Sequence, residues 1–215
     1  MSIERVIELL EQEYGVLRWQ PQGEPVDVLI RTILSQNTSD TNSDRAFDSL
    51  KAGFDGWEGV ASAPVESIAR AIQSGGLFRI KAARIKQILE RIEEEQGGIS
   101  LDSLGSMTAF EAESYLMGLP GVGYKTARCV LLFSLGKPSL PVDTHILRVS
   151  KRLGLIDSRA SMDRAHALLA EQVPASKVYQ FHVHMIEHGR KTCRARRLLC
   201  NRCALISVCP SSSLT

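Results

Sequence analysis

Apolar residues recur at intervals of three and four positions along most of the chain, which is the spacing of one buried face of an α-helix. The clearest case is the stretch 77–92, and the pair Gly97-Gly98 is expected to end that helix. Its predicted buried face consists of Leu77, Ile80, Ile85, Ile88, Leu89 and Ile92. Further helices are predicted over about 2–13, 25–36, 41–51, 64–73, 108–117, 125–135, 144–153, 161–171 and 175–189.

Signals at the starts of two of these helices agree with the periodicity. Thr108 and Glu111 fit a capping box, in which each side chain accepts a hydrogen bond from a free backbone amide of the other's segment. Asp143 stands at the N-cap position of the helix predicted from residue 144. No segment shows the alternation of a series of strands, and no internal repeat is present. The sequence therefore predicts an all-α fold.

Two segments rich in glycine and proline, 20–24 and 136–141, are candidate joints between domains. They delimit a helical domain over 25–136. The remaining segments, 1–24 and 137–215, are predicted to form a second domain together, in which the N-terminal helix packs with the C-terminal part of the chain.

The composition of the 215 residues, 44% apolar and 23% charged, is ordinary for a globular protein. No apolar run approaches the length of a membrane-spanning helix. The first fifteen residues carry acids at regular intervals and lack an apolar signal core, which argues against secretion. We expect a cytoplasmic protein.

The net charge of +2 conceals a strongly basic end. From residue 186 onward six basic residues stand against the single acid Glu187, so the rest of the chain is slightly acidic. Four of the basic residues, Arg190, Lys191, Arg194 and Arg196, are candidate contacts to a polyanion. A solvated basic tail without a partner is the alternative.

Four of the five cysteines lie within the last part of the chain, in the pattern Cys193-x6-Cys200-x2-Cys203-x5-Cys209. Four thiolates can hold one tetrahedral zinc ion or an iron–sulfur cluster. Structural zinc sites usually use two close pairs, whereas only one close pair occurs here. This spacing favours a [4Fe-4S] cluster, in which each iron takes one thiolate. Cys129 lies in the apolar run C-V-L-L-F and is predicted to be an inert core residue.

The segment Gly121-Val122-Gly123 separates two predicted helices and can form a tight hairpin whose backbone amides face an anion. Lys125 follows in the first turn of the next helix. A positive charge is unfavourable at that end of a helix, which favours the neutral, nucleophilic amine. A lysine that is solvated or paired with phosphate is the alternative. Asp143, besides capping its helix, is a candidate carboxylate for stabilising a cationic sugar or accepting protons.

Three motifs stand in order along the chain: L-P-G-V-G-Y-K-T-A at Leu119–Ala127, V-D-T-H at Val142–His145, and the four-cysteine pattern. In this combination the chain resembles the endonuclease III family of helix-hairpin-helix DNA glycosylases, from about residue 25 to Cys209. The resemblance implies a helical barrel domain with the hairpin, an iron–sulfur cluster domain, and a DNA-binding cleft between them.

The resemblance also implies a function and a set of roles. The family removes damaged, chiefly oxidised, pyrimidines in base excision repair and then nicks the abasic site. Lys125 would attack C1′ of the deoxyribose and form a Schiff base, Asp143 would support that reaction, and the four cysteines would hold one [4Fe-4S] cluster. The partner would be double-stranded DNA with damaged bases or abasic sites, bound by a monomer associated with the nucleoid.

Two further segments match the family's contacts to the opened base stack. Leu77 occupies the position of an apolar wedge. Gln36 and Asn37 match the segment that fills the space left by the extruded base, although Asn37 stands where the family usually has glutamine. Tyr124 is a second departure, since many members carry a basic residue there.

Three other functions were weighed against this one. A related mismatch-type thymine or uracil glycosylase, which typically has tyrosine at the position of the lysine, and a non-catalytic DNA-binding relative are the main alternatives. The pattern His184-x-x-Glu187-His188 also matches a metallopeptidase motif, but no third ligand is apparent.

Overall fold

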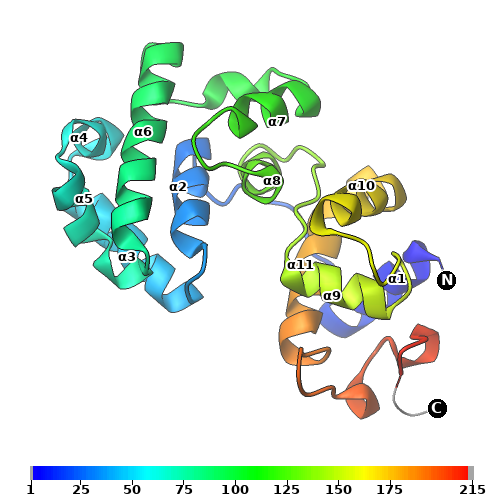
Figure 1. Cartoon of the computed structure of the whole chain (residues 1–215). Coiled ribbons are helices and arrows are strands. Elements are labelled where there is room, and N and C mark those ends of the chain that lie inside the picture. Colours follow the sequence, from blue (N-terminus) through cyan, green and yellow to red (C-terminus); the bar gives the residue numbers. More distant parts are fainter. Residues whose placement is uncertain (1, 213–215) are drawn as a thin grey trace. The chain divides into compact units, whose positions relative to one another are not determined.

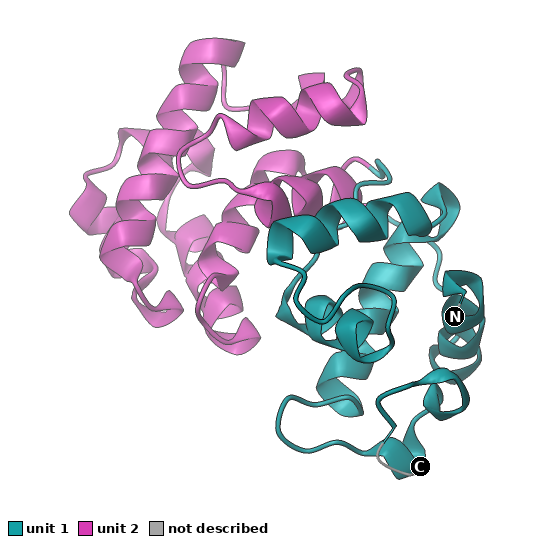
Figure 2. Cartoon of the chain, turned by 45° about the vertical axis from the view of Figure 1, so that its right-hand side comes forward, with its two compact units in different colours: residues 1–20, 136–215 teal, residues 21–135 magenta. Residues whose placement is uncertain are grey.

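The structure is a computed structural model that describes residues 2–212. The chain divides into two compact units, coloured separately in Figure 2. Unit 1 combines the residues up to 20 with those from 136 onward, and unit 2 comprises residues 21–135. Both divisions fall within a few residues of the glycine- and proline-rich segments.

Eleven α-helices are formed by the described residues, and they contain no β-strand beyond one isolated bridge between Cys193 and Leu198. Unit 2 contains α2 (Pro25–Ser35), α3 (Asp40–Gly53), α4 (Gly56–Ser62), α5 (Val65–Ala71), α6 (Phe78–Gln96), α7 (Ala109–Met117) and α8 (Tyr124–Phe133) (Figure 1). Unit 1 contains α1 (Ile3–Tyr14), α9 (Thr144–Arg152), α10 (Met162–Gln172) and α11 (Val178–Lys191). The predicted all-α class is confirmed. Between residues 2 and 212, no helix combines the length and apolarity needed to cross a bilayer.

Helix α6 supplies much of the core of unit 2, but its buried face differs from the predicted one. The side chains of Ile85, Ile88, Leu89 and Ile92 are fully buried. Leu77 and Ile80, in contrast, are 53% and 59% exposed. The helix begins only at Phe78, and Lys81 and Ala82 occupy the core face of its first turns. Gly97 ends the helix in the left-handed conformation, with φ +72°, as predicted.

Helix α4 was not predicted. It has seven residues, two of them glycine, so it is too short to show a clear helical period. Trp57 and Val60 nevertheless bury their side chains in the core of unit 2. Tertiary packing rather than helix propensity stabilises such a short element.

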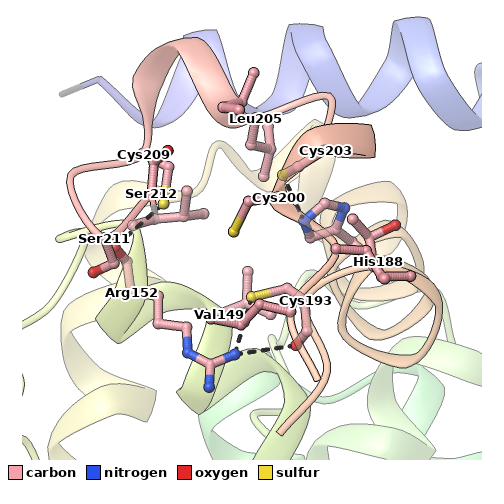
Figure 3. A pocket seen from close by; sticks show the side chains of 15 residues that line it. Val149, Arg152, His188, Cys193, Cys200, Cys203, Leu205, Cys209, Ser211 and Ser212 are labelled. Carbon is pink, nitrogen blue, oxygen red and sulfur yellow. Dashed lines mark hydrogen bonds between the residues drawn. The ribbon is translucent and has the colours of Figure 1, made fainter. Parts of the chain in front are cut away.

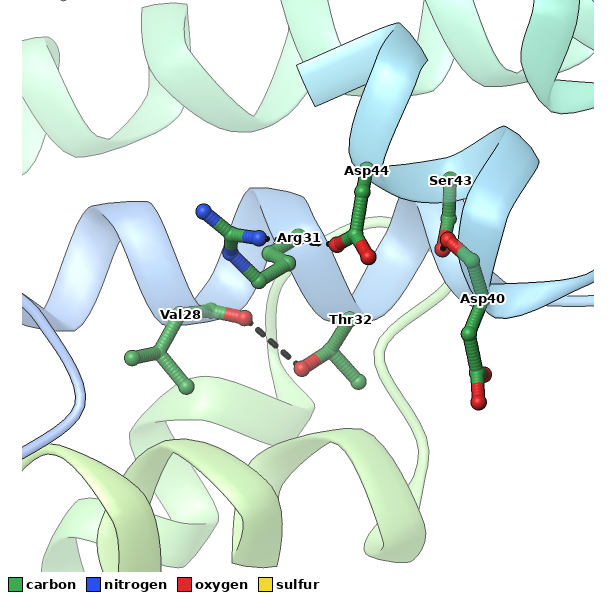
Figure 4. Close-up of polar contacts among 6 residues, drawn as sticks. All are labelled: Val28, Arg31, Thr32, Asp40, Ser43 and Asp44. Atoms are coloured by element: carbon green, nitrogen blue, oxygen red, sulfur yellow. Dashed lines mark hydrogen bonds and ion pairs between the residues drawn. The ribbon is translucent and has the colours of Figure 1, made fainter. Parts of the chain in front are cut away.

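Helices α2 and α3 pack together through apolar faces, with polar contacts at their exposed side (Figure 4). Arg31 of α2 donates to Asp44 of α3 at 2.9 Å, and both side chains are about half exposed. Thr32 donates its hydroxyl hydrogen to the carbonyl oxygen of Val28 at 2.7 Å, which satisfies a buried hydroxyl within the helix. An exposed ion pair of this kind contributes little, about 0–1 kcal/mol, so the apolar contacts stabilise the pair of helices.

Helices α7 and α8 flank the segment 118–123. The predicted capping box at the start of α7 is present, since Thr108 accepts from the Glu111 amide and Glu111 accepts from the Thr108 amide. The two helices are joined by a largely buried ion pair, in which Arg128 donates from Nε to Glu113 at 2.6 Å and from Nη2 at 3.2 Å. This two-pronged contact fixes the helices on either side of the segment between them.

In unit 1, the N-terminal helix α1 packs on α11. The Tyr14 hydroxyl lies 3.1 Å from Nδ1 of His188, and the Leu17 amide donates to the Gln180 side chain at 2.9 Å. Helix α9 packs on the same helix α11. The C-terminal cysteine segment follows directly from α11, so this helix positions it.

Candidate functional site

The segment 118–123 forms a tight turn that depends on Gly121. Its φ of +69° lies in the left-handed region, and a Cβ built there would lie 2.2 Å from Nε of Arg84. Because the guanidinium of Arg84 fills that space, no residue larger than glycine fits without displacing it. Gly123 has an ordinary extended conformation, with φ −105°, and is the N-cap residue of α8.

Val122 holds the hairpin to unit 2. Its side chain is buried in the core, and its amide donates to the Leu119 carbonyl at 3.2 Å. Its amide is therefore engaged within the hairpin. Gly121 and Gly123 are both exposed. Together with the first turn of α8, their backbone amides are the ones that can meet an anion.

Lys125 is the second residue of α8 and is half-buried. Its ammonium group has no hydrogen-bond or ion-pair partner within the described residues of unit 2. The neighbouring Thr126 is buried, and the guanidinium of Arg128 lies 5.5 Å from the centre of the Tyr124 ring. The residues around Lys125 thus have structural contacts, whereas its amine is left available.

A chain of hydrogen bonds links Gln36 to the helix that carries Lys125. Arg84 donates to Oε1 of Gln36 at 3.2 Å, and Nε2 of Gln36 donates to the Thr126 hydroxyl at 3.4 Å. Both ends of the Gln36 amide are therefore engaged inside unit 2. Asn37, the next residue, is exposed and adopts the left-handed conformation with φ +53°. Of the two residues predicted at this position, Asn37 presents its side chain to solvent.

In unit 1, Asp143 is the N-cap residue of α9, as predicted. Its Oδ1 accepts a hydrogen bond from the Ile146 amide at 2.8 Å. The cap uses one carboxylate oxygen, and Oδ2 has no partner among the residues described in unit 1. The capping role and a chemical role are therefore compatible for this half-buried side chain.

The four clustered cysteines line one pocket in unit 1, and Figure 3 shows their sulfur atoms directed into a common space. The walls are mainly apolar and include Val149, Leu153 and Leu205. Burial raises the pKa of the Cys203 thiol to about 11 and also raises the pKa of Cys209. Burial thus disfavours the thiolate form of both residues, and a bound cation would offset that penalty.

The spacing of these cysteines bears on which group they could hold. In the part of the chain that the structure describes, no three histidine, cysteine or acidic side chains converge as ligands of a single metal ion. Tetrahedral zinc with Zn–S bonds of about 2.3 Å brings its sulfur atoms to roughly 3.8 Å from one another. A [4Fe-4S] cluster is larger, and each of its irons binds one thiolate. Both groups take four thiolates, which is the donor set that lines this apolar pocket.

Two arginines of α9 hold the cysteine segment, and sequence reasoning missed both. Arg148 donates to the carbonyl oxygens of Gly189 at 2.9 Å and Cys193 at 3.2 Å. Arg152 donates to the Cys193 sulfur at 3.3 Å and to the Arg194 carbonyl at 2.8 Å. The two arginines are four residues apart and therefore lie on one face of the helix. This spacing is the feature of the sequence from which they could have been found.

The two histidines of the H-x-x-E-H pattern lie in the interior of unit 1. His184 and His188 are both buried, and burial lowers the pKa of His188 to about 4. His188 lies between the Tyr14 hydroxyl and the Cys203 sulfur, at 3.6 Å from the latter. These contacts give His188 a structural role beside the cysteine pocket.

The basic residues at the end of the chain are exposed. Lys191 pairs with Glu187 at 2.5 Å, and Nε of Arg194 donates to the Arg190 carbonyl at 3.1 Å. Arg196 is exposed as well. These side chains therefore form a basic surface next to the cysteine pocket.

Comparison with known proteins agrees with this arrangement. The model of the HhH-GPD superfamily of base excision DNA repair proteins matches residues 30–175. Endonuclease III of Thermotoga maritima is 36% identical over 87% of this chain and 84% of its own length. A homologue from Arabidopsis thaliana is 38% identical over 77% of this chain, which spans 56% of that longer protein.

Among solved structures, a trapped covalent intermediate of endonuclease III with DNA superposes with a TM-score of 0.85 and 27% identity. The match covers 98% of this chain and 95% of that protein. These findings confirm the predicted fold, the resemblance to endonuclease III and the class of base-excision DNA glycosylase. The chain belongs to the HhH-GPD superfamily of base excision DNA repair proteins.

Proposed function

We propose that this protein is a bifunctional DNA glycosylase that removes damaged pyrimidines from double-stranded DNA and cleaves the resulting abasic site through Lys125. The observation that carries the proposal is the position of Lys125, directly behind the Gly121–Gly123 hairpin, with an amine that no residue of unit 2 engages. The covalent DNA intermediate of the 27% identical endonuclease III supports the same chemistry here.

In the proposed reaction the damaged nucleotide is first extruded, because its glycosidic bond cannot be reached inside the base stack. The lone pair of Lys125 Nζ forms a bond to C1′ while the bond from C1′ to the base breaks. The base leaves with the electron pair and takes up a proton. Ring opening then gives a Schiff base, and loss of a C2′ proton expels the 3′ phosphate by β-elimination.

Asp143 has two tasks in this proposal. Its carboxylate stabilises the positive charge that develops on the sugar, and it accepts the proton that the attacking amine loses. The hydrogen bond from the Ile146 amide to Oδ1 fixes the carboxylate while Oδ2 remains available. A charged group held in this way need not reorganise as the charge develops.

The remaining predicted residues would bind the DNA. Gly121 and Gly123 would present backbone amides to phosphate, with Val122 anchoring the hairpin, and Leu77 and Asn37 would enter the opened stack. Gln36 would support Asn37 from within unit 2. Arg190, Lys191, Arg194 and Arg196 would contact phosphates nonspecifically. We propose a monomer that acts on nucleoid DNA in the cytoplasm.

The four cysteines, Cys193, Cys200, Cys203 and Cys209, would hold one [4Fe-4S] cluster. The apolar pocket and the sulfurs directed into it support this assignment. Such a cluster would supply a rigid cross-link of the loop that carries the basic residues. Arg152 would stabilise the Cys193 thiolate by its N–H donor.

Changing Lys125 to alanine should abolish covalent capture of abasic duplex DNA by borohydride, because the substitution removes the amine that forms the proposed Schiff base. Affinity for the same DNA should fall less than about tenfold, since the glycine amides and basic residues remain. Lys51→Ala serves as the control and should trap normally. Trapping that persists in Lys125→Ala and disappears with another lysine would refute the assignment.

The two roles of Asp143 can be separated by two substitutions. Asparagine caps a helix about as well as aspartate, so Asp143→Asn should keep the thermal stability of the wild type but lose roughly 100-fold or more in single-turnover base excision. Alanine removes both roles, and Asp143→Ala should in addition lose about 1 kcal/mol of stability. Normal turnover by the asparagine variant would show that the residue is only a cap.

Serine at Cys200 should give protein with little bound iron and sulfide, because one iron of the cluster loses its thiolate. The iron and sulfide content and the visible absorbance of the purified protein measure this. Cys129→Ala, at the buried cysteine outside the pocket, should retain about four irons per chain. One zinc per chain in the wild type, without iron, would contradict the cluster.

A panel of duplexes with single lesions tests the substrate class and separates the alternatives. Base release and strand nicking are measured independently on oxidised or ring-saturated pyrimidines, on uracil or thymine opposite guanine, and on undamaged DNA. We expect release and nicking together on the oxidised pyrimidines. Release from mismatches without nicking would favour the mismatch-type glycosylase, and binding without any release would favour a non-catalytic relative.

A further inference from the structure

Lys81 is a buried lysine that the reaction described above does not use. Its residue is only 2% exposed, on the core face of α6, one turn after Leu77. A buried ammonium is costly unless its hydrogens are engaged, and burial accordingly lowers the pKa of Lys81. The contacts of the Lys81 ammonium explain how its charge is stabilised in the core.

The Lys81 ammonium joins the ends of two separate elements. It donates to the carbonyl oxygen of Leu34 at 2.7 Å and to that of Gly75 at 2.6 Å. Leu34 lies in the last turn of α2, where carbonyl groups lack helical partners, and Gly75 ends the short 3-10 helix η1 (Gln73–Gly75). The positive charge also meets the negative end of the α2 dipole.

Each of these two carbonyls stands at the start of a loop. In the proposed function, both loops enter the opened base stack. We call residues 35–38 and 75–77 the paired loops. Within residues 2–212, Asn37 and Leu77 are the only residues other than glycine with positive φ, at +53° and +47°. The left-handed conformation costs a residue other than glycine of order 1 kcal/mol or more. Such a conformation is kept only where the surrounding contacts hold the backbone in place.

The paired loops also lie against one another. A Cβ built at Gly76 would lie 3.8 Å from the Thr38 hydroxyl and 3.9 Å from the Asn37 carbonyl oxygen. Both left-handed residues are exposed, Leu77 by 53%. Two exposed residues in the left-handed conformation thus belong to neighbouring loops, and one buried cation joins the carbonyls at the start of these loops.

We propose that Lys81 is a positioning residue that locks the paired loops into one rigid wedge, so that Leu77 and Asn37 enter the base stack together. This inference rests on the proposed function, because it takes the paired loops as the part that opens DNA. Unstacking costs a few kcal/mol per step, and a wedge that is ordered in advance does not add the entropy of ordering two loops to that cost.

The test compares Lys81→Met with the wild type on two abasic substrates. Methionine keeps the length and apolar stem of lysine and removes every N–H donor. In a duplex the wedge must displace stacked bases, whereas a single-stranded oligonucleotide has no paired stack to open. We expect the single-turnover rate of borohydride trapping to fall roughly tenfold or more on the duplex and less than about threefold on the single strand, in line with the loss of charged hydrogen bonds.

Lys86→Met is the matched control on the same helix. Lys86 is also largely buried and donates to a backbone carbonyl, that of Ala61, with an additional ion pair to Glu90, but it contacts neither of the paired loops. It should slow trapping equally little on both substrates. If Lys81→Met is too unstable to purify, Lys81→Gln, which removes the charge of the ammonium, takes its place, and the loss on the duplex should again exceed the loss on the single strand.

A double-mutant cycle separates positioning from a general structural effect. If Lys81 acts through the wedge, Lys81→Met should cost less than about threefold on the duplex once Leu77 is alanine. Equal losses on the two substrates, or full additivity with Leu77→Ala, would overturn the inference while leaving the proposed function intact. Failure of the wild type to trap either substrate would instead overturn the proposed function.

Discussion

The functional loops of unit 2 depend on two cations that helix α6 directs inward, one turn apart. Lys81 binds the carbonyls of Leu34 and Gly75, and Arg84 binds Gln36 and fills the space above Gly121. Three separate loops are therefore anchored to one stretch of one helix. Lys81 binds main-chain carbonyl groups, and Arg84 binds the side-chain amide of Gln36, so neither cation is paired with a carboxylate here. Because the Lys81 contacts are made to the backbone, they fix the path of the main chain itself. This is a direct way to hold loops that are proposed to contact DNA.

The sequence predicted those features of the fold that are local in origin. The capping box of Thr108, the glycine that ends α6 and the N-cap of Asp143 each depend on residues within one turn of one another. The prediction of the buried face of α6 was wrong where contacts with neighbouring elements determine which side chains enter the core. Ile80 continues the apolar period but lies beyond the core, while Lys81 enters the core because the ends of α2 and η1 supply carbonyl partners. Periodicity contains no information about such partners.

The candidate site shows the same difference between local features, which the sequence predicts, and long-range contacts, which it does not. The hairpin, Lys125, Asp143 and the four cysteines could be proposed from motifs, because each motif is contiguous or nearly so. Arg84, Arg148 and Arg152 could not, since their roles consist of contacts to residues tens of positions away. Gln36 is an instructive case. The resemblance of its segment to the family implied a contact with DNA, and the structure adds that its amide is engaged at both ends by Arg84 and Thr126.

Asp143 illustrates why a structural role does not argue against a chemical one. A carboxylate without a fixed contact would sample several rotamers, and each would have to be abandoned before it could stabilise a developing charge. The hydrogen bond from Ile146 removes that freedom at the start of α9, and Arg148 and Arg152 tie the same helix to the cysteine segment. The cap, the helix and the cysteine loop thereby form one supported body. In the proposed reaction, the cysteine segment would contribute by steadying the helix that Asp143 caps, and no transfer of electrons is required for that contribution.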